Sequence, residues 1–65
     1  MIKIAIRFQD NTVAVFERNG EQPPQYQGQY DEVKERVQED APPDAVFAHS
    51  FTDSAELQKV SREEW

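Results

Sequence analysis

One segment constrains the fold of this chain more than any other. Its apolar residues recur at helical spacing along one side, and its charged residues lie on the opposite side. At 3.6 residues per turn, Tyr30, Val33 and Val37 share one side of the segment from Gly28 to Asp40. The opposite side carries four carboxylates: Asp31, Glu32, Glu35 and Glu39. The pattern predicts an amphipathic helix that begins near Gly28 and ends near Asp40, before the proline doublet at 42–43.

Burial of the apolar stripe is expected to decide the stability of this helix. Each buried apolar side chain contributes about 1.5–3 kcal/mol. The attractive pair Glu32–Arg36 and the repulsive pair Glu35–Glu39 each change stability by only about 0.2–0.5 kcal/mol. The helix therefore needs an apolar surface to cover, and β-rich segments lie on both sides of it.

The first eighteen residues predict that surface, as a β-hairpin. In residues 2–8, Ile and Phe alternate with Lys, Ala and Arg, which is typical of a strand with one apolar face. Asp10 and Asn11 both favour turns, so we expect a two-residue turn with Gln9 opposite Thr12 and a return strand over 12–18.

This turn fixes an expected register for the hairpin. It pairs Phe8 with Val13 and Ile6 with Val15 on one apolar face. Phe16 then lies on the outer face. The cations expected around it are Lys3, Arg7 and Arg18.

The second half of the chain predicts two more strands and a final turn. Residues 45–51 form an apolar run typical of a buried strand. Residues 56–60 are favoured as a fourth strand, although a helix capped by Thr52 or Asp53 is the alternative. A capping-box pattern at 61–64 predicts a last helical turn that folds Trp65 back onto the fold.

These elements predict an α+β fold in the order β-β-α-β-β, built as one domain over residues 1–65. The expected sheet is small, with three or four strands in antiparallel or mixed arrangement, and one helix packs on one of its faces. Cysteine is absent, so neither a disulfide nor a thiolate metal site can stabilise the fold.

The charge distribution narrows the partners that we expect. The net charge is −6, which disfavours nucleic acid and anionic membranes. Residues 1–18 hold three cations against two carboxylates, whereas residues 19–65 hold four cations against eleven carboxylates. Met1 leads directly into an alternating strand without an export signal, so we expect a cytoplasmic protein of bacterial type.

Chemical motifs are weak throughout the sequence. His49 is the only histidine and lacks partners at metal-ligand or catalytic spacing, so we interpret it as a packed or rim side chain. The helix carboxylates lack the alternating ligand pattern of a calcium loop. We therefore expect neither an enzyme nor a cofactor or metal site.

Three stretches carry a resemblance to a known group of proteins: MIKIAIRFQDN, YQGQYDEVKERV, and APPDAVFAHSF through SREEW. Together they resemble short, acidic, uncharacterised proteins of bacterial prophages and mobile elements. The resemblance implies a context rather than an activity, since accessory proteins of such elements usually bind host or element proteins. It assigns a role to no residue.

Three hypotheses for function follow. The first is a small protein-binding module, a regulator or inhibitor, that presents Asp31, Glu32, Glu35 and Glu39 to a basic surface. The second is a structural homodimer through a sheet edge or the Phe16 face. The third is weak binding of single-stranded nucleic acid through Lys3, Arg7, Phe16 and Arg18.

Overall fold

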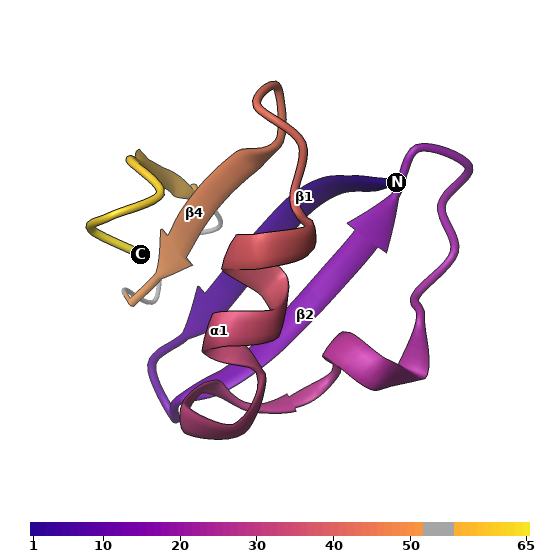
Figure 1. The fold of residues 1–65 in the computed structure, drawn as a ribbon. Coiled ribbons are helices and arrows are strands. Elements are labelled where there is room, and N and C mark those ends of the chain that lie inside the picture. Colours follow the sequence, from indigo (N-terminus) through magenta and orange to yellow (C-terminus); the bar gives the residue numbers. More distant parts are fainter. Residues whose placement is uncertain (52–55) are drawn as a thin grey trace.

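A computed structural model describes residues 1–51 and 56–65. The described residues form an α+β fold in which one α-helix lies across one face of a five-stranded mixed sheet (Figure 1). The elements in chain order are β1 Ile2–Phe8, β2 Thr12–Glu17, the short 3-10 helix η1 Pro24–Tyr26, β3 Gly28–Gln29, α1 Tyr30–Asp40, β4 Val46–Ser50 and β5 Gln58–Val60.

The strand order is β3-β2-β1-β4-β5, with β1 in the centre. β1 pairs antiparallel with β2 and parallel with β4, so α1 belongs to the crossover that parallel neighbours require. The sheet has more strands than the sequence predicts, because the chain makes a two-residue pairing with β2 just before the helix. The predicted α+β class is confirmed, and of the two arrangements left open, antiparallel or mixed, the sheet is mixed.

Helix α1 is confirmed with the predicted face towards the sheet. Tyr30, Val33 and Val37 are only 7%, 4% and 0% exposed. Gly28, with φ of 135°, has a backbone conformation that favours glycine where the chain enters the short pairing with β2, and the helix begins two residues later. The amide of Ala41 donates to the Val37 carbonyl at 2.9 Å and closes the last turn.

The predicted hairpin register is wrong by one residue. The loop has three residues instead of two, because Asn11 adopts a left-handed φ of 67° after a tight turn in which its amide donates to the Phe8 carbonyl at 2.9 Å. Arg7 therefore pairs with Val13, in place of the predicted Phe8. A slip of one residue moves every side chain of one strand to the other face.

The corrected register changes which residues meet the helix. Ala5 and Val15 pair on the helix side of the sheet and are fully buried. Ile4 and Ile6, which were expected to share an apolar face with Val15, lie on the other side. An irregularity of the ladder between Ile2 and Ile4 returns Ile2 to the helix side, where it joins the core.

The tail is confirmed as a turn that buries Trp65. Ser61 and Glu64 form the predicted capping contacts, with the Glu64 amide donating to Ser61 Oγ at 3.2 Å. Trp65 is 1% exposed and packs edge-on against Tyr30 and Phe47. The preceding strand is confirmed at Gln58–Val60, while the alternative helix start at Thr52 or Asp53 lies outside the described residues.

Candidate functional site

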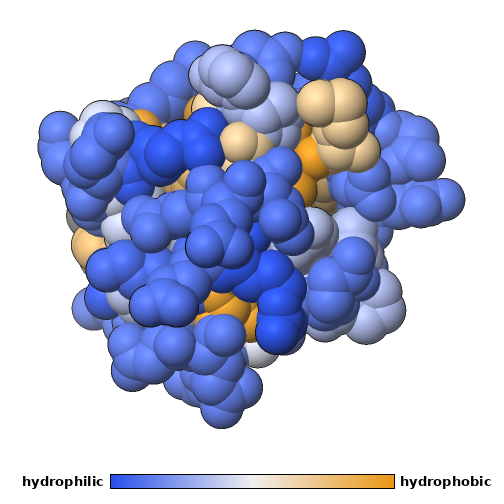
Figure 2. Space-filling model, viewed as in Figure 1, coloured by the Kyte–Doolittle hydropathy of each residue, from blue (hydrophilic) through white to orange (hydrophobic). Residues whose placement is uncertain are grey.

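The four helix carboxylates lie together on the solvent side of α1. We call this set the acidic helix face: Asp31, Glu32, Glu35 and Glu39. All four residues are exposed, on the side of the helix that points away from the sheet. Figure 2 shows that hydrophilic residues dominate the view onto the helix, with smaller apolar areas between and beside them. The structure thus brings together the four residues that the sequence singled out.

Among the described residues, the ion pairs are Met1–Glu17 and Arg18–Asp44. None of the four carboxylates of the acidic helix face therefore has a cation of the described residues within ion-pair distance. The cations on α1 are engaged elsewhere. Arg36 Nη1 donates to the Gln25 carbonyl at 2.8 Å, rather than to Glu32 as expected, because η1 brings that carbonyl beside the helix. Lys34 lies over the Tyr30 ring at 5.4 Å from its centroid. The negative charge of the face is therefore not neutralised locally.

A second acidic segment lies beside the helix, and sequence reasoning did not find it. The Arg62 side chain donates to the backbone carbonyls of Gln38 and Pro42, and the Gln38 side chain donates to the Arg62 carbonyl at 2.9 Å. These bonds attach the exposed Glu63 and Glu64 next to the C-terminal half of α1. Only the tertiary contacts of Arg62 reveal this, since 24 residues separate it from Gln38.

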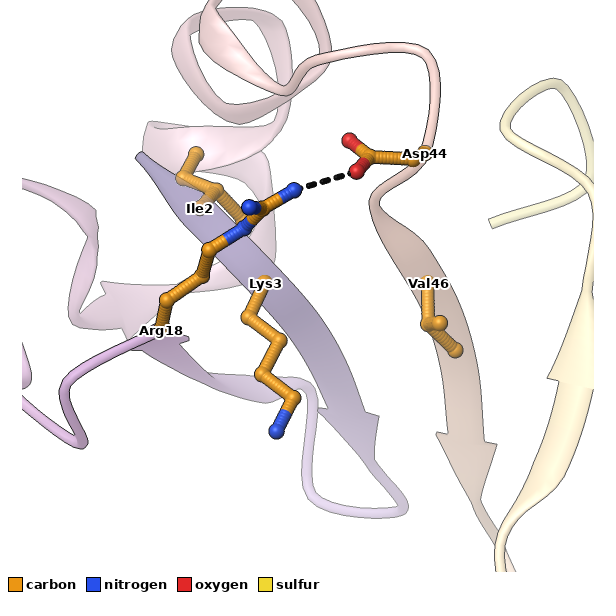
Figure 3. A pocket seen from close by; sticks show the side chains of 5 residues that line it. All are labelled: Ile2, Lys3, Arg18, Asp44 and Val46. Carbon is orange, nitrogen blue, oxygen red and sulfur yellow. Dashed lines mark hydrogen bonds and ion pairs between the residues drawn. The ribbon is translucent and has the colours of Figure 1, made fainter.

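The alternative cationic surface is only partly assembled. Lys3 and Arg18 line one cleft of about 390 Å³, where Arg18 reaches across to Asp44 (Figure 3). Phe16 lies on the sheet face opposite the helix, paired with Ile4. The expectation that Arg7 flanks Phe16 is wrong, because the three-residue loop turns Arg7 to the helix side. A stacking platform would therefore rely on Lys3 and an Arg18 that already has a carboxylate partner.

Arg7 instead ties three parts of the fold together. Its guanidinium carbon lies 3.6 Å from the centroid of the Tyr30 ring. Nη2 donates to Asn11 Oδ1 at 2.9 Å, and Nη1 donates to the Trp65 carbonyl at 3.1 Å. His49 Nε2 lies 3.2 Å from the same carbonyl, so the lone histidine is a half-buried rim residue of this cluster.

Among the described residues, two titratable groups have a shifted pKa, and both lie outside the acidic helix face. Hydrogen bonds from the Thr12 hydroxyl and amide lower the pKa of Asp10. The hydrogen bond to Asp40 raises the pKa of the Tyr26 phenol, because the phenol donates only while it is protonated.

Metal ligation and membrane insertion find no support in the part of the chain that the structure describes. No three His, Asp or Glu side chains in residues 1–51 and 56–65 come together as metal ligands. No described helix is both long enough and apolar enough to cross a membrane.

Comparison with known proteins identifies no relative. No protein-family model, curated protein or solved structure matches this chain. What the site can do is therefore argued from its own geometry, as an exposed anionic surface held on a rigid helix.

Proposed function

We propose that the protein is a small, non-enzymatic protein-binding module, a regulator or inhibitor, that uses its acidic helix face to bind a basic surface on another protein. The observation that carries the proposal is the set of four exposed carboxylates without an ion-pair partner among the described residues. The adjacent Glu63 and Glu64 extend the same charge.

The arrangement of the charges favours recognition over fold stability. Asp31, Glu35 and Glu39 follow one another at four-residue intervals, so they project along one side of the helix over about 12 Å at 1.5 Å per residue. Mutual repulsion within the face costs some stability. A partner that supplies Lys or Arg side chains would remove that repulsion and would be steered towards the face by its field.

A basic protein surface, in some cases one that otherwise holds nucleic acid, is the chemistry that fits this face. Individual exposed ion pairs contribute only about 0.2–1 kcal/mol. Four to six of them together give a salt-sensitive interaction that depends on several carboxylates at once. The resemblance to prophage and mobile-element proteins supports a bacterial cytoplasmic setting for such a partner.

The test is affinity capture from a bacterial lysate at about 0.05 and 0.3 M salt, where screening differs strongly. The variant Glu32→Lys/Glu35→Lys changes the acidic helix face. Its matched control, Glu21→Lys/Glu56→Lys, makes the same change in net charge at exposed positions off the helix. We expect the wild type and the control to retain a partner that the helix variant loses, and that high salt releases. Equal capture by all three proteins would refute the proposal.

A further inference from the structure

The sheet face opposite α1 is apolar across three neighbouring strands. Ile4 pairs with Phe16 on one side and with Val46 on the other, and Ile6 pairs in the same way with Ala14 and Ala48. Residues that pair directly point to the same side of a sheet. We call this the outer sheet face, and its apolar members are Ile4, Ile6, Phe8, Ala14, Phe16, Val46 and Ala48.

None of the described elements covers the outer sheet face. Figure 1 shows α1 on one side of the sheet, with no helix or strand layered on the other. Trp65 also packs on the helix side, against Tyr30 and Phe47. Ile6 and Ala48, in the middle of this face, are already buried within one chain, at 9% and 0% exposed, whereas Phe8, Phe16 and Ile4 around them remain partly exposed. A sheet with one face in water normally alternates apolar and polar residues, whereas a sheet that is apolar on both faces is typical of one covered on both sides.

Pairing through the β2 edge of the sheet is blocked by the chain itself. Gln27 Oε1 accepts a hydrogen bond from the Val15 amide at 3.2 Å, and Gln27 Nε2 donates to the Val15 carbonyl at 2.8 Å. One side-chain amide thus occupies both backbone groups that an added strand would use. β3 occupies the rest of this edge at Thr12 and Val13. A second protein chain can therefore pack on the outer sheet face more readily than it can add a strand at the β2 edge.

The charges favour a second copy of the chain as the occupant. The strands carry a single carboxylate, Glu17, which pairs with Ile2 on the helix side, so no strand carboxylate points to the outer sheet face. Lys59 lies on this face, paired with Ala48. Two copies that meet through these faces keep their acidic helix faces on the outside, at the largest separation. Contact through the helix faces would instead bring together two sets of carboxylates.

The two ends of the outer sheet face are oppositely charged. Lys3 lines the cleft at the start of β1, and Asp10 lines another at the end of β1, together with Phe8. A two-fold axis in the plane of the interface and perpendicular to the strands places the Lys3 end of one copy over the Asp10 end of the other. This arrangement forms the Lys3–Asp10 pair twice, once at each end, because the interface is symmetric.

We propose that the outer sheet face is a self-association surface, where a second copy packs sheet to sheet about 10 Å away and leaves the helices outside. Four strands of about five residues, at about 4.8 Å and 3.3 Å spacing, present a plane of roughly 300 Å². This is well below the ~800 Å² per partner of a standard interface, so a micromolar dimer is expected rather than a nanomolar one. The proposal does not depend on the acidic helix face.

Sedimentation velocity on the purified chain, from about 1 to 500 µM, tests a dimer of that strength. We expect the mass to rise towards twice that of one chain, and to rise further with salt because the repulsion between two −6 chains is screened. Phe16→Glu should abolish the increase, whereas Glu35→Gln on the helix should leave it. A monomer over the whole range, or a dimer that Phe16→Glu leaves intact, would overturn the proposal.

A second variant keeps the test decisive if Phe16→Glu does not fold. Lys3 is exposed and outside the core, so Lys3→Glu is expected to fold. It should weaken the dimer about twofold to thirtyfold, since two exposed ion pairs of about 0.2–1 kcal/mol each are lost. Asp10→Lys in the same chain should recover part of that loss. Unchanged association in Lys3→Glu, with no recovery, would refute the antiparallel arrangement.

The salt response also separates this proposal from the first, since partner capture should weaken in salt while the dimer strengthens.

Discussion

The two faces of the sheet carry similar amounts of apolar side chain but meet different surroundings. On the helix side, Ala5 and Val15 are fully buried beneath α1 and beside Trp65. On the outer side, Ile6 and Ala48 are buried at the centre of the face, but the larger Ile4, Phe8 and Phe16 stay partly exposed. The comparison shows that the position of the core depends on which face α1 and Trp65 cover, and not on the number of apolar residues that each face carries.

The comparison of the two faces can be tested by truncating one aromatic side chain on each, and the helix side should show the largest loss in the free energy of unfolding. Trp65→Ala removes the edge-on contacts with Tyr30 and Phe47 and the hydrogen bond from Nε1 to the Ala48 carbonyl. We expect a loss of about 3–5 kcal/mol in the free energy of unfolding, as is usual for a buried aromatic. A chain of this size is stable by only a few kcal/mol at about 0.05–0.15 kcal/mol per residue, so much of the variant should be unfolded.

Phe16→Ala is the matched change on the outer sheet face. Because Phe16 is only partly buried in one chain, we expect less than half of the loss caused by Trp65→Ala at low protein concentration. Urea unfolding of both variants at about 1 µM, at the low end of the expected dimer range, measures the comparison. Equal losses at that concentration would contradict the difference between the two faces.

An intermediate effect is expected at the sheet edge that Gln27 closes. Gln27→Ala leaves the Val15 amide and carbonyl without the bonds that the side-chain amide provides. The two bonds to Val15, at about 0.5–1.5 kcal/mol each, suggest a loss of about 1–3 kcal/mol. The variant also loses a third bond, from Gln27 Nε2 to the Pro23 carbonyl at 3.2 Å. The free edge should also add strand-to-strand association that Phe16→Glu does not remove.

Hydrogen exchange at the Val15 amide reports the edge directly, and Gln22→Ala in the exposed loop is the control. We expect faster exchange in Gln27→Ala and unchanged exchange in the control. Unchanged protection in Gln27→Ala would show that the side chain does not close the edge.

The helix and its charged face could be predicted because their determinants are local. The spacing of Tyr30, Val33 and Val37 and the proline doublet at 42–43 suffice to place α1 and to expose the acids. The hairpin register could not be predicted in the same way. Asp10-Asn11 suits a two-residue turn as well as a three-residue loop with Asn11 in a left-handed conformation, and the two differ by one residue.

The parts of the candidate site that could not be predicted from the sequence depend on tertiary contacts. Arg62 brings Glu63 and Glu64 beside α1 through backbone carbonyls that no sequence pattern marks. Arg7 was expected beside Phe16, but its position depends on the register and therefore on the loop. The loop conformation thus decides both which face is apolar and which cations accompany it.

The smallest expected effect tests this loop through its pH dependence. The Thr12 hydroxyl and amide hold the pKa of Asp10 below its ordinary value of 3.8. A carboxyl whose pKa is lower in the folded chain adds stability above the unfolded pKa, and loses it as the pH falls through the lower folded value. Urea unfolding of the wild type should therefore show a small decrease in stability over that acidic range. Asp10→Asn should lack this decrease, whereas Glu21→Gln, at an exposed loop position, should retain it. If Asp10→Asn follows the wild type through the whole range, the bonds to Thr12 do not stabilise the three-residue loop, and the assignment of the two sheet faces loses its local cause.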